Sequence, residues 1–101
     1  AADDTKMQTL AVETARYARV IRDAVWNHTR AAAAAGDLFA YETNGYGGMY
    51  LMDDANVPSL VSLPYLGFLD RDDATYQATK KMLFSRANPY YAAGAQFNGI
   101  G

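Results

Sequence analysis

The chain has 101 residues, half of them apolar, with 20% charged residues and a formal net charge of −2. This is the profile of a globular domain rather than a disordered chain, and the weak negative charge provides no basic face for nucleic acid. The absence of cysteine and the single histidine exclude disulfides, thiolate metal sites and a histidine-rich metal centre. No apolar run approaches the ~20 residues that span a bilayer, and residues 1–4 do not resemble a signal peptide. We therefore expect neither a nucleic-acid nor a membrane partner, and the compartment stays open between secreted and cytoplasmic.

The first third of the chain predicts one long amphipathic helix. Asp3 and Asp4 place negative charge at the positive end of such a helix. Apolar residues then recur at steps of three and four from Met7 to Val25. The alanines at 31–35 continue the helix, and Gly36 supplies its C-terminal stop. The expected length is about eight turns.

Residues 37–50 have the pattern of a short hairpin or paired loop. Two segments that can be extended, 38–42 and 49–52, flank a glycine-rich turn that contains Asn44 and Gly45. If the extended backbone continues to residue 54, side chains alternate across it. Asp53 and Asp54 are then expected to point to opposite sides.

Two shorter helices are predicted in the second half. Asn56 is a good N-cap and Pro58 fits a first turn, which together predict a helix over 57–66. A further helix is predicted over 74–85, with Asp72 or Asp73 as its cap. The expected fold is mainly α, with about three helices plus a short hairpin or loop pair in one domain.

Carboxylates are the groups that can carry chemistry here. There is no nucleophile elbow or phosphate-binding loop, but Glu42, Asp53 and Asp54 are expected near one another, amid tyrosines that include Tyr41. Glycoside cleavage uses a pair of carboxyl groups, and a tyrosine ring can cover the C–H face of a sugar. The alternative reading is helix capping and ordinary turn chemistry. Because a helix N-terminus favours an ionised Asp, a proton donor in this pair would need burial or a neighbouring carboxylate to raise its pKa.

Several motifs resemble glycoside hydrolase family 125. They are Phe39-Ala-Tyr-Glu-Thr-Asn-Gly-Tyr-Gly47, Leu51-Met-Asp-Asp-Ala-Asn-Val-Pro-Ser59, Leu63-Pro-Tyr-Leu-Gly67, Asn88-Pro-Tyr-Tyr91 and Gly99-Ile-Gly101. Their order and approximate spacing agree with the family from about Leu38 to the last residue. The resemblance implies a fragment of an (α/α)6 barrel, with residues 1–101 forming part of a catalytic domain that extends beyond both ends.

The resemblance also implies an activity and a site. The activity is that of an inverting exo-α-1,6-mannosidase that releases terminal mannose from α-1,6-linked mannosides without a metal or other cofactor. This chain would carry the general-acid half, would be inactive alone, and would have the remainder of its parent domain and an α-1,6-linked mannose oligosaccharide as partners. The implied catalytic residues are Asp53 and Asp54, with Asp53 favoured as the acid, and the implied sugar-binding residues are Glu42, Asn56, Ser59 and Tyr41. A non-catalytic helical interaction module or a carbohydrate-binding module is the alternative.

Overall fold

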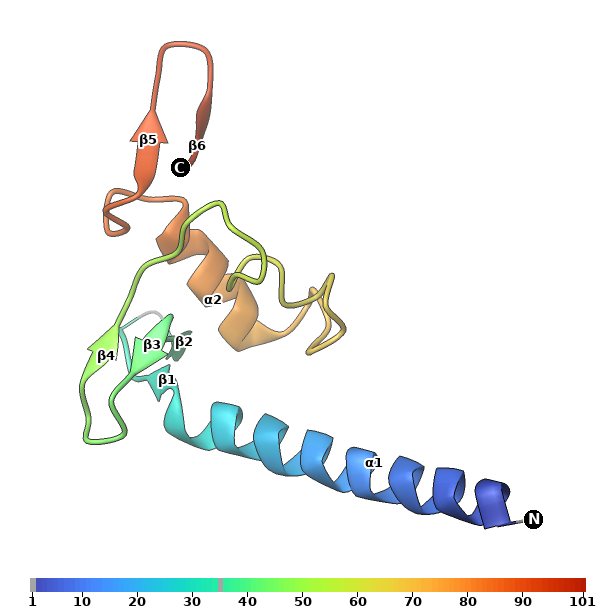
Figure 1. Ribbon diagram of the computed structural model, residues 1–101. Helices are drawn as coiled ribbons and strands as arrows, with labels where there is room; N and C mark the ends of the chain where they lie inside the picture. The colour runs from blue at the N-terminus through green and yellow to red at the C-terminus, as the bar shows by residue number, and fades with distance from the viewer. Residues whose placement is uncertain (1, 35) are drawn as a thin grey trace.

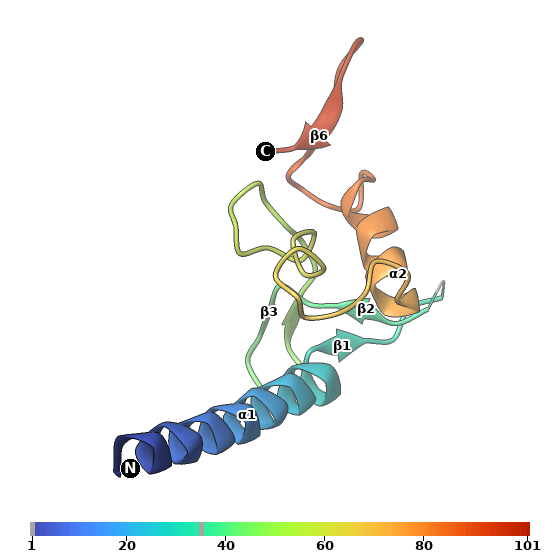
Figure 2. The same cartoon turned by 90° about the vertical axis from the view of Figure 1, so that its right-hand side faces the viewer.

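The computed structural model describes residues 2–34 and 36–101 (Figure 1). In chain order its elements are α1 (Ala2–His28), β1 (Arg30–Ala31), β2 (Leu38–Phe39), β3 (Glu42–Thr43), β4 (Met49–Tyr50), α2 (Ala74–Leu83), β5 (Tyr91–Ala93) and β6 (Asn98–Ile100). The long helix α1 reaches away from the rest of the chain, and the β5–β6 hairpin projects at the opposite end (Figures 1 and 2). The molecule is accordingly elongated, with extents of 63 × 33 × 24 Å.

The prediction of a mainly α fold, a fragment of an (α/α)6 barrel with about three helices, is wrong. The described residues form two helices and three antiparallel two-stranded sheets, β1–β2, β3–β4 and β5–β6. The expected helix over residues 57–66 is a series of turns instead. The structure therefore mixes short sheets with helices and is not a piece of a helical barrel.

In segment 57–66, side-chain oxygens accept from main-chain N–H groups that would have donated to carbonyls in a helix. The N–H of Val61 would bond to the carbonyl four residues earlier in a helix, but it donates to Asp53 Oδ2 at 2.9 Å. Ser59 and Ser62 bond to each other's main chain, at 2.8 Å and 3.2 Å. Pro64 has no N–H to donate at all. These bonds hold the segment in turns.

Helix α1 ends at His28, so the predicted continuation over residues 31–35 is wrong for its described part; Ala35 lies outside the described residues. Ala31 pairs with Leu38 in the β1–β2 sheet. The pairing accompanies the burial of Phe39, which is 1% exposed. Burying one such ring is worth about 1.5–3 kcal/mol, more than the few tenths of a kcal/mol that separate alanine from other residues in a helix. Gly36, expected as a helix stop, has a φ of 117° in the connection between the two strands.

The predicted hairpin is confirmed in β3 and β4, where Glu42 pairs with Tyr50 and Thr43 with Met49. Its turn is held by Asn44, whose Oδ1 accepts from the main-chain N–H of Tyr46 at 2.8 Å and of Gly48 at 3.0 Å. An asparagine that bonds to the backbone two residues ahead is a common turn device.

The last predicted helix is confirmed as α2. Asp73 is its N-cap, because its carboxylate accepts from the N–H of Tyr76 at 2.8 Å. Of the two aspartates left open by the sequence, the structure thus selects Asp73. The helix ends at Leu83, two residues before the predicted end.

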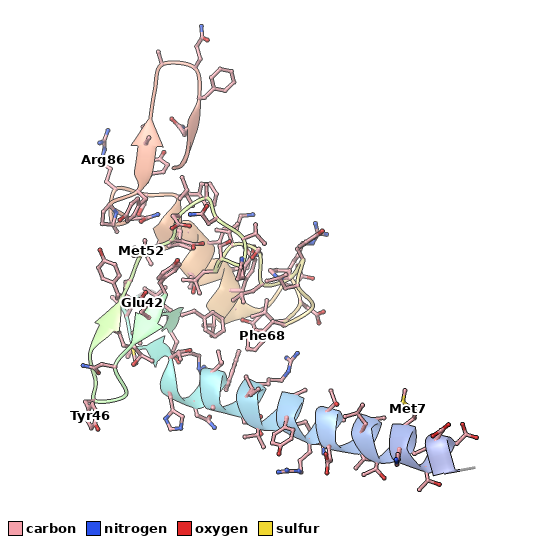
Figure 3. The ribbon with its side chains drawn as sticks, viewed as in Figure 1. Met7, Glu42, Tyr46, Met52, Phe68 and Arg86 are labelled. Atoms are coloured by element: carbon pink, nitrogen blue, oxygen red, sulfur yellow. The ribbon has the colours of Figure 1, made fainter. Side chains whose placement is uncertain are left out.

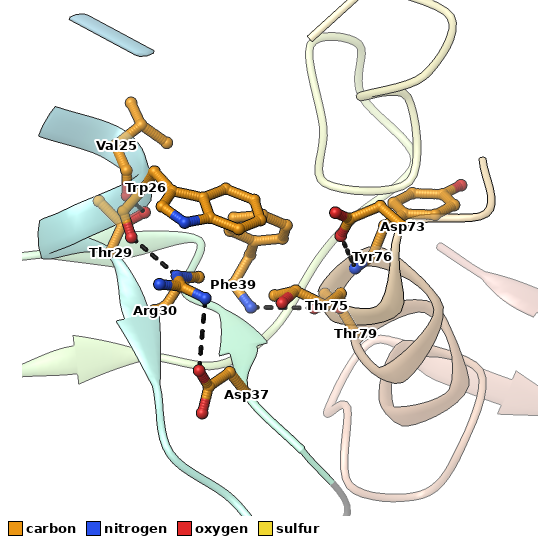
Figure 4. Close-up of polar contacts among 10 residues, drawn as sticks. All are labelled: Val25, Trp26, Thr29, Arg30, Asp37, Phe39, Asp73, Thr75, Tyr76 and Thr79. Carbon is orange, nitrogen blue, oxygen red and sulfur yellow. Dashed lines mark hydrogen bonds and ion pairs between the residues drawn. The ribbon is translucent and has the colours of Figure 1, made fainter. Parts of the chain in front are cut away.

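The small core lies where the end of α1, strand β2 and helix α2 meet (Figure 4). The ring of Phe39 packs edge-on against Trp26, with centroids 5.6 Å apart, and against Phe68 at 6.3 Å. Its main-chain N–H donates to Thr79 Oγ1 of α2 at 2.9 Å. The other buried apolar residues are Leu38, Ala40, Met52, Tyr76 and Leu83.

Most of α1 lies outside this core. Residues 3–24 are all exposed, including the apolar positions Met7, Leu10, Tyr17 and Ile21. Figure 3 shows Met7 on α1, far from the core. Within residues 2–34 and 36–101, neither helix is long and apolar enough to cross a membrane.

Candidate active site

The carboxylate of Asp53 is held inside the molecule. Asp53 follows strand β4 on irregular backbone and is 0% exposed. Its Oδ2 accepts from the N–H of Val61, whereas Oδ1 is buried with no hydrogen-bond partner among the described residues. Burial raises the pKa of Asp53, and the neighbouring Asp54 carboxylate adds to the rise, against the opposing effect of the N–H groups of Val61, Leu60 and Asp54. The result is a desolvated acid fixed by one oxygen.

The main chain of Asp53 is held by Asn88, which the sequence did not single out as a site residue. Asn88 is 1% exposed and lies in the loop after α2. Its Nδ2 donates to the carbonyl oxygen of Asp53 at 3.0 Å, and its Oδ1 accepts a longer bond from the N–H of Asp53 at 3.4 Å. In the sequence, Asn88 was marked only as the first residue of the motif over residues 88–91 that resembles the family. One buried amide therefore spans both main-chain groups of this aspartate.

Tyr76 supports the same turn from helix α2. Its hydroxyl donates to the carbonyl oxygen of Val61 at 2.8 Å, on the residue whose N–H binds Asp53. Burial raises the pKa of Tyr76, which keeps its hydroxyl in the donating form. Helix α2 thus holds the Asp53 carboxylate indirectly, through the turn.

Asp54 lies differently. It is half-buried, and its Oδ1 accepts from the main-chain N–H of Asn56 at 2.8 Å. One acid of the pair is enclosed and the other retains exposed surface. The expectation that they point to opposite sides stays a prediction, because it depends on extended backbone to residue 54 and β4 ends at Tyr50. The charge of the Asp54 carboxylate is also the largest cause of a raised pKa at the Tyr41 hydroxyl, ahead of burial and the Asp53 carboxylate. Tyr41 is therefore within electrostatic reach of both acids.

Two hollows adjoin this region. One, of about 370 Å³, is lined by Tyr41, Glu42, Pro58, Ser59, Leu60, Leu63 and Leu66. The other, of about 260 Å³, lies over the β3–β4 hairpin and is lined by Glu42, Thr43, Asn44, Gly48, Met49 and Tyr50. The first brings together three of the four predicted sugar-binding residues, with apolar side chains forming its other wall. Glu42 borders both hollows, and neither is lined by Asp53, Asp54 or Asn56.

The remaining predicted residues serve the turn. Asn56 is exposed, and its expected role as a helix N-cap is wrong because no helix follows it. Ser59 Oγ accepts from the N–H of Ser62 at 3.2 Å, so its hydroxyl is engaged while it borders the hollow. In the part of the chain that the structure describes, no group of three or more His, Cys, Asp or Glu side chains is placed to hold a metal ion.

Both a family model and individual known proteins match this chain. Residues 1–101 match the family described as metal-independent alpha-mannosidase (GH125). The Meiotically up-regulated gene 157 protein of Schizosaccharomyces pombe (strain 972 / ATCC 24843) is 58% identical over 67 residues, which is 65% of this chain and 13% of the yeast protein. A metal-independent alpha mannosidase of Streptococcus pneumoniae, solved in a non-productive substrate complex with alpha-1,6-mannobiose, superposes with a TM-score of 0.84 at 36% identity. That superposition covers 93% of this chain and 22% of the bacterial one.

These similarities place the chain among the glycoside hydrolases. More narrowly, it belongs to the GH125 family of metal-independent α-mannosidases. The resemblance predicted from about Leu38 onward is confirmed, and the match also includes α1. The chain spans 13% of the yeast relative and 22% of the bacterial mannosidase.

Proposed function

We propose that this chain is one portion of an exo-acting α-mannosidase that releases terminal mannose from α-1,6-linked mannosides with inversion. Family membership supports the α-mannosidase class, and the bound disaccharide of the Streptococcus pneumoniae relative supports the linkage. Inverting hydrolysis uses two carboxyl groups ~6.5–9.5 Å apart with a water between them. In this proposal the portion described here contributes the acid, and residues beyond it contribute the base. The small share of the relatives' length that this chain spans supports such a division.

Within the acid pair, Asp54 is the group that we assign to the sugar. A proton donor has to come within hydrogen-bond reach of the leaving oxygen. Asp53 has no exposed surface, and further chain packed against this conformation would only cover it more. Asp54 keeps exposed surface, and its charge raises the pKa of Tyr41, which borders the larger hollow. This difference in burial is the observation that carries the assignment, and it reverses the preference for Asp53 taken from the sequence.

The larger hollow is assigned to the sugar ring. Its volume of about 370 Å³ falls within the ~300–1,000 Å³ of typical ligand pockets. The ring of Tyr41 and the apolar wall formed by Pro58 and Leu60 suit the C–H face of a pyranose, and Glu42 can accept from its hydroxyl groups. Asp53 then acts from inside, by holding the turn that forms this wall.

The experiment compares Asp54→Asn with wild type in the full-length protein on two substrates. One is α-1,6-mannobiose, whose leaving group needs a proton, and the other is 2,4-dinitrophenyl α-mannoside, whose leaving group does not. Loss of a general acid is expected to lower kcat about 10²–10⁴-fold on mannobiose and far less on the aryl mannoside. Asp70→Asn, at an exposed aspartate in the connector before α2, is the matched control.

Three results would contradict the proposal at different levels. Equal losses on both substrates would make Asp54 a sugar-binding residue rather than the proton donor. Activity of Asp54→Asn equal to that of Asp70→Asn would remove Asp54 from the site. Absence of mannose release by the wild-type protein would reject the activity itself.

A further inference from the structure

We infer that Asn88 is a positioning residue that sets the orientation of the Asp53–Asp54 pair. The inference rests on the proposed function, since Asp54 is the group whose placement then matters for catalysis. Asn88 touches neither hollow and acts through the main chain of Asp53. Its contribution therefore differs from that of a residue that binds sugar.

The Asn88 side chain uses all of its hydrogen-bonding capacity. Nδ2 donates to the carbonyl oxygens of Asp53 at 3.0 Å and Leu83 at 3.1 Å. Oδ1 accepts from the N–H groups of Asp53 at 3.4 Å and Tyr90 at 3.2 Å. Two donors and two acceptor sites are what an amide offers. Because each end faces groups of the opposite kind, exchanging oxygen and nitrogen would break all four bonds, so the orientation of the amide is fixed.

Asn88 occupies the place of a neighbouring strand. In a hydrogen-bonded pair of an antiparallel sheet, each residue donates its N–H to the carbonyl of the residue opposite and accepts from that residue's N–H. Here a single side-chain amide bonds both main-chain groups of Asp53, which follows β4 beyond its last paired residue. The bond to the Leu83 carbonyl ties this amide to the end of α2. The amide thus ties the main chain of Asp53 to helix α2, although no strand among residues 2–34 and 36–101 pairs with Asp53.

The carbonyl that Asn88 holds lies in the peptide bond that joins Asp53 to Asp54. The carbonyl of Asp53 and the N–H of Asp54 belong to one planar peptide unit. Holding that carbonyl through Asn88 fixes the plane. The bond that the N–H of Asn56 donates to Asp54 Oδ1 then fixes the side chain relative to this backbone. Loss of Asn88 would leave the side chain of Asp54 intact but would release the backbone that aims it.

Asn88→Asp is the sharpest test because it keeps the shape of the side chain. It replaces both donated bonds by a carboxylate oxygen facing the carbonyl oxygens of Asp53 and Leu83. Asn98→Asp makes the same chemical change at an exposed position in β6 and is the control. Both are made in the full-length protein, with hydrolysis of α-1,6-mannobiose, hydrolysis of 2,4-dinitrophenyl α-mannoside, and hydrogen exchange of residues 51–56 as readouts.

The expected result for Asn88→Asp has two parts. Hydrolysis of α-1,6-mannobiose falls about 10²-fold, the scale of a displacement near 1 Å in a catalytic group, while the aryl mannoside is affected much less. The amides of residues 53 and 54 exchange faster than in wild type or Asn98→Asp. If Asn88→Asp is not recovered folded, Asn88→Ala, which buries no charge, is measured by the same readouts.

Two results would overturn the inference. Unchanged exchange at residues 53 and 54 would show that Asn88 does not hold them, and equal losses on both substrates would reduce Asn88 to a structural role. Failure of the proposed function is distinguishable from either. If the wild-type protein hydrolyses no mannoside, but Asn88→Asp accelerates exchange at 53 and 54, the positioning stands and the mannosidase proposal falls.

Discussion

Replacing Thr79 by valine is expected to loosen the contact between helix α2 and strand β2. Thr79 Oγ1 accepts from the N–H of Phe39 at 2.9 Å and donates to the Thr75 carbonyl at 2.7 Å (Figure 4). Thr79 and Phe39 are both 1% exposed, so no water replaces the lost hydroxyl. Valine fills nearly the same space, which leaves the change chemical rather than steric.

The magnitude follows from the group left unpaired. A buried N–H without a partner costs about 1–3 kcal/mol. The Thr75 carbonyl loses only an additional bond within the helix. Thr14 on α1 makes the equivalent bond, from its hydroxyl to the Leu10 carbonyl at 2.7 Å, but is exposed. Thr14→Val should therefore change stability by no more than about 0.5 kcal/mol, and the difference between the variants isolates the Phe39 amide.

Native-state hydrogen exchange of the full-length protein measures this difference locally. A tenfold change in opening corresponds to about 1.4 kcal/mol, so segment 38–40 should exchange about 5- to 150-fold faster in Thr79→Val. In Thr14→Val it should exchange as in wild type. Equal exchange of segment 38–40 in the two variants would refute the role given to this hydrogen bond.

The other predictions concern Asp53, which holds a turn, and Asp73, which caps helix α2. Because burial raises the pKa of Asp53, the folded protein keeps this proton where the unfolded chain, with an ordinary value of 3.8, has released it. The free energy of unfolding should fall as pH rises from about 4 to the folded pKa. Asp53→Asn removes that dependence. In urea denaturation, the free energy of unfolding of the variant relative to wild type should therefore rise with pH across this window. A difference in free energy that stays constant with pH would contradict the burial argument. Asp73→Ala should cost about 1 kcal/mol in urea denaturation through loss of the α2 cap, and Asp72→Ala, at the exposed neighbour, should cost little. Similar losses in both would argue against capping.

Elements set by neighbouring residues could be predicted from the sequence. The Asn44 turn and the Asp73 cap depend on side chains that bond two to four residues ahead. The sequence predicted the turn and narrowed the cap to Asp72 or Asp73. The turns over 57–66 depend instead on Asp53, eight residues before Val61, and on Tyr76, fifteen residues after it. Apolar residues with a capping signal are typical of a helix. Nothing in residues 57–66 themselves reveals that the carboxylate of Asp53 accepts from the N–H of Val61, which a helix would have used.

The sequence predicts which residues could form a site but not how they are arranged. Asp53 and Asp54 differ in burial, and Tyr41, Glu42 and Ser59 border one hollow. Whether the two acids point to opposite sides stays a prediction. Which acid is enclosed depends on packing against α2 and its following loop, which periodicity does not describe. An asparagine before a proline reads as a turn residue, so the buried role of Asn88, whose partner lies 35 residues away, carried no local signal.

A crystal structure of the full-length protein with an uncleavable, sulfur-linked analogue of α-1,6-mannobiose tests the central claim most directly. The account predicts a carboxyl oxygen of Asp54 about 2.6–3.2 Å from the linking atom, with Asp53 still enclosed on the N–H of Val61. An Asp53 oxygen at that atom, or a sugar bound elsewhere while Asp54 faces bulk solvent, would contradict it.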